Sequence, residues 1–182
     1  MFKKAILVTS NQNKIREFQK LVPDIKIEEG SDIKEVLGNM DEVIIHKSKD
    51  KGENYLVEDS ILLINGEEVV DIKWKMNELK EGDKVTWIVS LGYNNGDCIY
   101  IFRGVIEGTI TLNGNIGFGF DSYFIPVDCK EGLSLAELDI LGKKEEFSAR
   151  KLALQNFIDI KLEIPPVKIE SIPKWTGKYQ NE

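Results

Sequence analysis

Near the N-terminus, the residue types and their spacing are suited to binding a phosphate group. Asn11 and Lys14 follow a short apolar run and stand where a helical pattern opens. The first turn of a helix offers unpaired backbone N–H groups and the positive end of the helix dipole, and both attract anions. Lys14 opposes that dipole, so its position favours an anion site. A helix start that is simply capped by Asn11 or Asn13 explains this segment equally well.

An acidic pair, Glu58 and Asp59, follows the apolar run from Tyr55 to Val57 and could hold a metal ion. The run predicts a strand that ends at the pair, and α/β folds place ligand sites at the C-terminal ends of strands. Adjacent carboxylates are costly to bury unpaired, so they either face water or hold a cation. Mg²⁺ takes one or two carboxylates and completes its shell with water and phosphate oxygens. Taken alone, the pair is also typical of a solvated turn.

A loop rich in glycine and phenylalanine offers a surface for a flat ring. Phe118 and Phe120 flank Gly119, and Asp121 follows. This set could stack on a nucleobase and hydrogen-bond its edge, although two phenylalanines that fill the core give the same pattern. Two cations and a hydroxyl open the last long helical pattern: Lys144, Ser148 and Arg150. They could contact a base or a phosphate, or they could simply be solvated.

The elements that must position these residues alternate between strands and helices. Hydrophobic periodicity predicts strands at 6–8, 25–27, 55–57, 85–93, 98–106 and 109–112, and helices at 14–22, 41–51, 71–80, 133–138 and 147–158. Between two β-type runs, Asn65-Gly66 predicts a hairpin, because a type I′ turn needs positive φ at both central residues. The proline-bearing tail from Ile164 predicts irregular or extended structure.

Composition limits the class of protein. The chain has 24 Lys and Arg against 31 Asp and Glu, and a net charge of −7 argues against an extended nucleic-acid surface. Two isolated cysteines argue against a disulfide framework and fit a reduced cytosol. No apolar stretch reaches membrane-spanning length, and no secretory signal is evident. We therefore expect a soluble, cytoplasmic protein without a nucleic-acid or membrane partner.

Four motifs occur in an order that is far more specific than any one of them. They are T-S-N-Q-N-K-I-R-E-F from Thr9, L-V-E-D-S from Leu56, G-F-G-F-D-S from Gly117 and K-K-E-E-F-S-A-R-K-L-A-L from Lys143. In this order they resemble the inosine triphosphate pyrophosphatase family, whose members hydrolyse non-standard purine nucleoside triphosphates. The resemblance spans roughly Ala5 to Phe157, nearly the whole chain.

The resemblance implies a role for each matched residue on the phosphate side. In the first motif, the residues implied to contact the triphosphate are Thr9, Ser10, Asn11 and Lys14. Lys47 is implied as a second phosphate ligand, which with Lys14 would stabilise charge on the departing pyrophosphate. Glu35 and Asp59 are implied as the ligands of Mg²⁺, and Glu42 stays open as an alternative to Glu35. Asp59, the expected group that polarises the attacking water, joins Lys14 and Lys47 as the expected catalytic residues.

On the base side, the resemblance implies substrate contacts from the later motifs: Ser60, Phe118, Gly119, Phe120, Asp121, Lys144, Ser148 and Arg150. The chain departs from the family pattern where Ser10 and Ile61 replace glycines and Ser122 replaces a proline. Ala149 stands where the family has a histidine that contacts the oxygenated edge of the purine. Its loss could weaken base discrimination, because hydrogen bonds to that edge select the base.

With this resemblance we expect an α/β fold, with an elongated mixed β-sheet flanked by helices and two lobes that form a central nucleotide-binding cleft. Residues 1–160 would form the nucleotide-pyrophosphatase domain of two lobes, and residues 161–182 a C-terminal extension. The implied reaction is Mg²⁺-dependent hydrolysis of ITP, dITP or XTP to a nucleoside monophosphate and pyrophosphate, by a homodimer. One alternative is a divergent member that binds or hydrolyses another nucleotide, or has lost turnover. Another is a non-catalytic interaction module that keeps only the fold.

Overall fold

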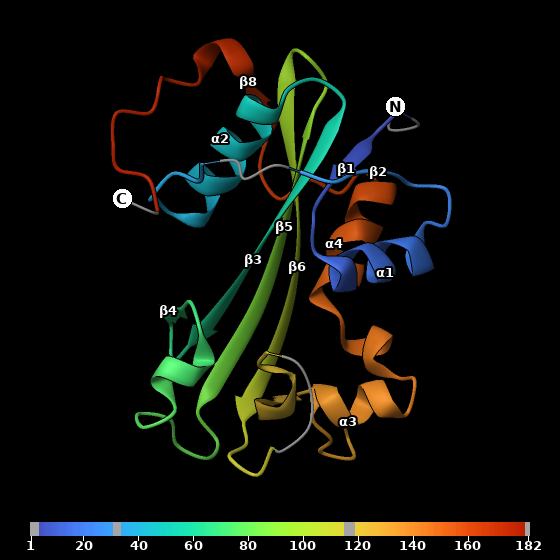
Figure 1. The fold of residues 1–182 in the computed structure, drawn as a ribbon, viewed down its shortest axis with the longest axis vertical. Helices are drawn as coiled ribbons and strands as arrows, with labels where there is room; N and C mark the ends of the chain where they lie inside the picture. Colours follow the sequence, from blue (N-terminus) through green and yellow to red (C-terminus); the bar gives the residue numbers. More distant parts are fainter. Residues whose placement is uncertain (1–3, 31–33, 115–118, 181–182) are drawn as a thin grey trace. The chain divides into compact units, whose positions relative to one another are not determined.

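A computed structural model of the chain describes residues 4–30, 34–114 and 119–180. The strands in this part of the chain are β1 (Ile6–Val8), β2 (Lys26–Glu28), β3 (Tyr55–Ile64), β4 (Glu67–Val69), β5 (Lys84–Asn94), β6 (Cys98–Ile110), β7 (Phe124–Pro126) and β8 (Val167–Lys168). The α-helices are α1 (Gln12–Leu21), α2 (Met40–Lys51), α3 (Leu135–Ile140) and α4 (Ala149–Ile158). Short 3₁₀ turns are η1 (Ile72–Lys75), η2 (Asp121–Tyr123), η3 (Lys144–Phe147) and η4 (Ile169–Ser171). Figure 1 shows the strands of the sheet with helices beside them.

The sheet is mixed, and this confirms the predicted α/β class. Its strand order is β2-β1-β3-β5-β6-β7, with β4 paired to β3 and β8 paired to β6. β1 runs parallel to both β2 and β3, and helices α1 and α2 lie in the connections that parallel pairing requires. The strands β4, β7 and β8 pair antiparallel to their neighbours.

The chain divides into two compact units. Unit 1 comprises residues 1–59, 89–104 and 150–182, and unit 2 comprises residues 60–88 and 105–149. The long strands β3, β5 and β6 contribute residues to both units. The expected cleft between two lobes and the expected domain boundary at residue 160 remain predictions.

The core of unit 1 contains a cluster of β-branched side chains from helix, sheet and C-terminal tail. Ile44 from α2 packs with Val57 from β3 and with Ile99 and Ile101 from β6. Ile172, beyond η4, joins the same cluster and is 8% exposed. The tail is therefore held to unit 1 by apolar burial as well as by the pairing of β8 with β6.

The strand β3 is longer than the sequence predicts, and this moves the acidic pair from the end of a strand to its interior. We expected the strand to end at Glu58, but β3 continues to Ile64. The reason is pairing: the second half of β3 forms a hairpin with β4 through Asn65 and Gly66. Both turn residues have positive φ, 49° and 84°, which confirms the predicted hairpin.

Two other predicted elements are wrong in extent. The predicted helix at 71–80 is reduced to the 3₁₀ turn η1, because the segment buries Ile72 and Leu79 but leaves Trp74 79% exposed. A short helix without a packed apolar face is marginal in water. The predicted separate strand at 109–112 is instead the end of β6, which runs without a break to Ile110.

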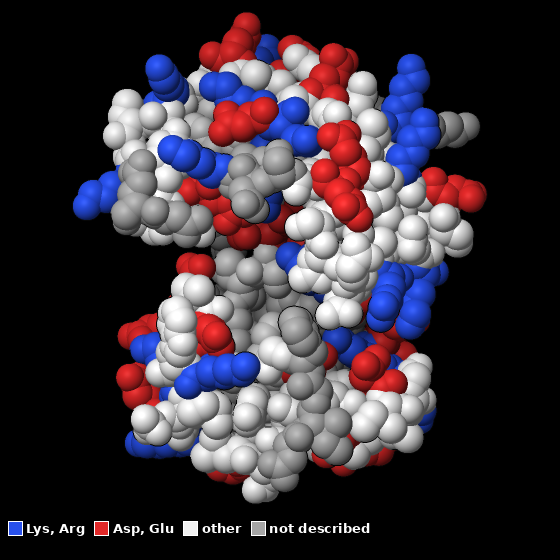
Figure 2. Space-filling model, viewed as in Figure 1, with Lys and Arg blue, Asp and Glu red and all other residues white. Residues whose placement is uncertain are grey.

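The surface carries charges of both signs. On the face shown in Figure 2, Lys and Arg side chains are interspersed with Asp and Glu side chains, as expected for a chain with 24 basic and 31 acidic residues. Among the described helices, none is both long enough and apolar enough to cross a membrane.

We expect Ile101→Ala to lower the free energy of unfolding by about 2–5 kcal/mol, because it removes atoms from a fully buried position and leaves a cavity. Ile158→Ala is the matched control, since Ile158 at the end of α4 is 50% exposed. This change should cost less than about 1 kcal/mol. Urea unfolding of both variants and the parent makes the comparison, and equal losses would contradict this description of the core.

Candidate functional site

The turn between β1 and α1 is tied down by hydrogen bonds at both ends. The Thr9 N–H donates to the Glu28 carbonyl in the neighbouring strand, at 3.2 Å. Asn11 is the N-cap, because its Oδ1 accepts the N–H groups of Asn13 and Lys14 at 3.0 and 3.2 Å. The capping interpretation is therefore confirmed at Asn11. Two backbone donors of the first turn are satisfied by this cap.

Glu58 is a buried carboxylate held between two cations in unit 1. Its Oε2 lies 2.7 Å from Lys14 Nζ of α1, and its Oε1 lies 3.6 Å from Arg150 Nη2 of α4. The side chain is 2% exposed, and Oε1 has no hydrogen-bond partner among the described residues. Burial opposes ionisation, but the charges of Arg150, Lys14 and Lys47 outweigh it and lower the pKa of Glu58.

Arg150 also joins α4 to α1. Its Nη1 forms an ion pair with the Glu17 carboxylate of α1, and these two helices lie side by side in Figure 1. Between Glu58 and Glu17 the guanidinium faces two carboxylates, and their charges outweigh its burial and raise the pKa of Arg150. The cation therefore stays charged in a position that is 9% exposed.

A second ion pair lies beside the same strand. Lys47 Nζ of α2 is 2.6 Å from Glu35 Oε1 and donates to the backbone carbonyl of Glu58 at 2.9 Å. Glu42 is engaged elsewhere: its carboxylate accepts the Asn39 N–H in the capping box at the start of α2. The structure therefore places Glu35, rather than Glu42, against Lys47.

The pKa of Asp59 is raised because the carboxyl group is largely buried. Burial contributes most to raising its pKa, and the charges of Glu35 and Glu58 add to this; Lys47 and Lys14 act in the opposite direction. The result is a pKa raised from 3.8 to about 6. Successive strand residues point to opposite faces, and Glu58 is buried while Asp59 keeps partial exposure. A partly exposed carboxylate with this pKa is suited to accept a proton or to bind a cation.

The donor set fits a divalent cation of the hard, oxygen-binding kind. Among the described residues no group of three or more His, Cys, Asp or Glu is arranged as a complete metal site. Mg²⁺ needs no such group, because one or two carboxylates suffice when water and phosphate oxygens complete the shell. The negative charge of Glu35 adds to burial in raising the pKa of Asp59, so a cation bound by these two carboxylates would relieve their repulsion.

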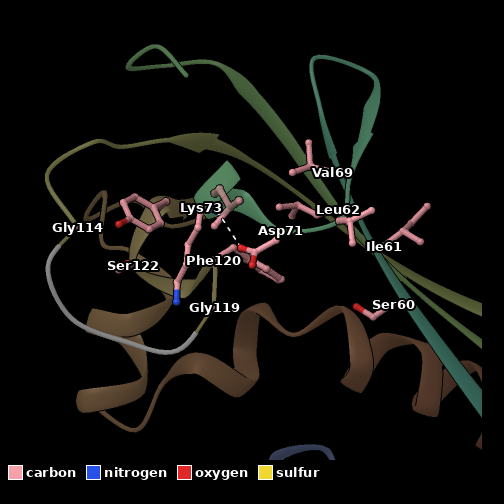
Figure 3. A pocket seen from close by; sticks show the side chains of 13 residues that line it. Ser60, Ile61, Leu62, Val69, Asp71, Lys73, Gly114, Gly119, Phe120 and Ser122 are labelled. Carbon is pink, nitrogen blue, oxygen red and sulfur yellow. Dashed lines mark hydrogen bonds between the residues drawn. The ribbon is translucent and has the colours of Figure 1, made fainter. Parts of the chain in front are cut away.

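Unit 2 contains a cavity of about 700 Å³. Figure 3 shows its lining: Ser60, Ile61, Leu62, Val69, Asp71, Lys73, Gly114, Gly119, Phe120 and Ser122. Trp87 supports two of these residues, since its Nε1 donates to Ser60 Oγ at 3.0 Å and its ring meets Phe120 edge-on at 5.6 Å. Gly119 has a φ of +60°, which a residue with a side chain adopts only with strain. Trp87 therefore holds Ser60 and Phe120 in place in the wall of this cavity.

The remaining predicted residues are placed as follows. Asp121 and Lys144 form an ion pair at 2.7 Å in unit 2, and Ser148 is buried in the same unit. Thr9 Oγ1 accepts the Asn11 N–H, and Ser10 is exposed. Phe118 lies outside the described residues. Ala149 is fully buried, so an imidazole at this position would have to displace its neighbours.

Comparison with protein families covers most of the chain. The sequence model of the Ham1 family matches residues 5–68 and 66–160 of this chain. The chain belongs to the Ham1 family. This confirms the resemblance to the inosine triphosphate pyrophosphatases that the four ordered motifs indicate.

Two relatives of this Ham1 chain align over shorter stretches. A dITP/XTP pyrophosphatase from Saccharolobus solfataricus is 35% identical over 75 residues, which is 40% of this chain and 38% of the relative. A dITP/XTP pyrophosphatase from Acholeplasma laidlawii is 33% identical over 103 residues, 56% of this chain and 48% of the relative. The aligned part of the chain thus spans less than half the length of each relative.

Solved Ham1 structures share the fold. A Ham1 protein from Coxiella burnetii superposes with a TM-score of 0.67 at 23% identity, covering 86% of this chain and 96% of that one. The Ham1 protein from Staphylococcus aureus gives a TM-score of 0.67 at 22% identity, with 86% and 99% covered. At these identities the likeness concerns the fold alone.

Sequence reasoning missed Glu17, which pairs with Arg150 in unit 1, and Trp87, which supports the cavity wall in unit 2. Glu17 belongs to the first motif, which therefore held a signal for it, but nothing local to Glu17 identifies Arg150 as its partner. Trp87 has a clearer signal, because an indole N–H in a buried strand needs an acceptor. That acceptor is Ser60, from the L-V-E-D-S motif.

In the absence of divalent cations, we expect Asp59→Asn to stabilise the protein increasingly as the pH rises. Because the folded pKa of Asp59 is about 6, above its ordinary value of 3.8, folding favours the protonated acid, and ionisation above pH 6 carries the full penalty. The variant should exceed the parent by about 1 kcal/mol at pH 4.5 and about 3 kcal/mol at pH 7.5. Urea unfolding in EDTA measures this difference. Asp128→Asn, at an exposed aspartate, is the control, and a gain for Asp59→Asn that does not change with pH would contradict the assignment.

Proposed function

We propose that this chain is a divalent-cation-dependent nucleoside triphosphate pyrophosphohydrolase that acts on ITP, dITP or XTP. The observation that carries the proposal is the charged cluster of unit 1. There Lys14, Lys47 and Arg150 surround an ionised Glu58, and Asp59 has a raised pKa. The two relatives with the names dITP/XTP pyrophosphatase support the reaction and the choice of base.

At the phosphate end, we assign the triphosphate to the start of α1. Lys14 and Lys47 would contact phosphate oxygens, together with the Thr9 and Ser10 hydroxyls and the Asn11 amide. Lys14 Nζ already pairs with the Glu58 carboxylate of β3, and Lys47 Nζ donates to the Glu58 carbonyl while it pairs with Glu35. They would therefore stabilise negative charge that develops on the departing pyrophosphate without first having to be ordered.

Asp59 and Glu35 would hold a divalent cation, which we take to be Mg²⁺. When bound, this cation would neutralise phosphate charge. Glu35 is preferred to Glu42 as the second ligand because the Glu42 carboxylate is used in the cap of α2. Both proposed ligands supply carboxylate oxygens, the donors that Mg²⁺ prefers.

Asp59 would also act on the attacking water. It would accept one proton as the water oxygen forms a bond to the α-phosphorus. The bond from that phosphorus to its bridging oxygen breaks, and pyrophosphate leaves with the electron pair. In the protein without a bound cation this carboxylate has a pKa of about 6, so it is mostly ionised at pH 7 and able to accept a proton.

The base would lie in unit 2 against the aromatic wall. We assign base or ribose contacts to Ser60, Phe118, Gly119, Phe120, Asp121, Lys144 and Ser148, and also to Arg150 of unit 1. Trp87 would hold Ser60 and Phe120 in place. Because Ala149 is fully buried, base preference would depend on the polar groups around it. A cytoplasmic homodimer is the assembly that we infer from the family resemblance.

Pyrophosphate release from ITP, dITP, XTP, GTP, ATP and dTTP with Mg²⁺ tests this proposal. We expect kcat/KM for the best of ITP, dITP and XTP to exceed that for ATP at least about 100-fold, because hydrogen bonds to the base edge select it. Asp59→Asn should lower the rate by about 100-fold or more through loss of the base and of a metal ligand. Asp128→Asn is the matched control, and it should leave the rate unchanged.

Two results would contradict the proposal in different ways. Equal release from all six nucleotides would leave the reaction in place but remove the base preference. Absence of release from any of them would overturn the assigned reaction.

A further inference from the structure

The C-terminal segment from Val167 to Gln180, here called the C-terminal strap, lies outside the residues that match the Ham1 family. It belongs to unit 1. Its first part is anchored by the pairing of β8 with β6 and by the burial of Ile172 in the core. In Figure 1 it then continues beside α2.

The end of the strap pairs with the segment that carries Glu35. Val36 and Tyr179 form an antiparallel β-bridge. The Leu37 N–H donates to the Lys178 carbonyl at 2.9 Å, and the Gln180 N–H donates to the Glu35 carbonyl at 2.9 Å. Gln180 Nε2 adds a bond to the Val36 carbonyl at 3.2 Å. Three hydrogen bonds therefore hold residues 35–37 on a strand-like path.

The middle of the strap contacts the helix that carries Lys47. The ring of Trp175 meets the ring of His46 edge-on, with centroids 5.2 Å apart, and His46 immediately precedes Lys47 in α2. Trp175 Nε1 donates to the Lys178 carbonyl at 2.9 Å, which links this contact to the paired end of the strap. The strap thus touches both elements that supply the Glu35–Lys47 pair.

The segment around Glu35 has little structure of its own. Residues 34–39 form neither helix nor ladder strand, and Val36 contributes only the bridge to Tyr179. A carboxylate on such a backbone must lose conformational freedom before it can bind a cation, and this loss weakens binding. Contacts that already fix the backbone remove part of that loss.

We propose that the C-terminal strap is a positioning element, which holds Glu35 against Lys47 and thereby sets the affinity of the site for a divalent cation. The proposal rests on the proposed function for the role of Glu35. Gln180 is its key positioning residue, because its backbone N–H bonds to Glu35 itself.

Two substitutions at one position separate the backbone bond from the side chain. Gln180→Pro removes the N–H that donates to Glu35 and also removes the amide side chain. Gln180→Ala keeps the N–H and removes only the side-chain bond to Val36. Both variants lack the side-chain bond to Val36, so they differ in the backbone N–H that bonds to Glu35 and in the restriction that proline places on its own φ and on Tyr179.

Amide NMR on protein without nucleotide gives two readouts. Hydrogen exchange at the Leu37 amide should be about fivefold faster in Gln180→Pro than in Gln180→Ala, as expected for loss of one adjacent backbone bond. Titration with Mg²⁺ alone, followed at residues 34–37, should give a dissociation constant about fivefold higher in Gln180→Pro. A lower melting temperature with an unchanged Mg²⁺ constant would show a merely structural strap and overturn the proposal. So would parent resonances that do not respond to Mg²⁺.

Neither readout needs turnover, so the strap and the proposed function can fail separately. If the parent releases no pyrophosphate from any nucleotide, the assigned reaction fails, while the Mg²⁺ constants still decide the role of the strap. If the parent is active, the Mg²⁺ concentration for half-maximal release should rise in Gln180→Pro relative to Gln180→Ala while kcat at saturating Mg²⁺ stays the same. An equal Mg²⁺ requirement in the two variants would overturn the proposal.

Discussion

Burial of an ionised carboxylate inside β3 is the constraint on which the site depends. Taking a charge out of water costs several kcal/mol unless opposite charges meet it with good geometry. Glu58 satisfies this condition with Lys14 from α1 and Arg150 from α4, and Arg150 in turn binds Glu17 on α1. One buried acid therefore requires two helices, far apart in the sequence, to approach the same strand. The arrangement of α1, α4 and β3 follows from it.

The neighbours of Glu58 acquire their chemistry from this arrangement. Its backbone carbonyl accepts a hydrogen bond from Lys47, which also holds Glu35. Asp59 follows in the strand, and its burial, with a further contribution from the negative charges of Glu35 and Glu58, raises its pKa. The two adjacent acids therefore have different roles. Glu58 organises cations, while Asp59 stays available to a metal ion, a water molecule or a proton.

Local features of the fold could be predicted from the sequence, and long-range features could not. Asn65-Gly66 identified its hairpin because the turn is a property of two residues. The sequence did not predict that β3 continues through Glu58 and Asp59. Acidic residues have a poor strand propensity, and pairing with β1, β4 and β5 overrides it. For the site, ordered motifs indicated most residues of the charged cluster. The bonds from Gln180 to residues 35 and 36 join distant parts of the chain, and no periodicity indicates such contacts.

Glu58 and Asp59, adjacent in sequence, have opposite pKa shifts, lowered for Glu58 and raised for Asp59. Carbon-13 NMR of the side-chain carboxyl groups, followed as a function of pH, tests this contrast directly. We expect Asp59 to titrate near pH 6, Glu58 to stay ionised below its ordinary pKa of 4.5, and Mg²⁺ to lower the Asp59 midpoint. Titration of both carboxyl groups at their ordinary values, with no response to Mg²⁺, would contradict it.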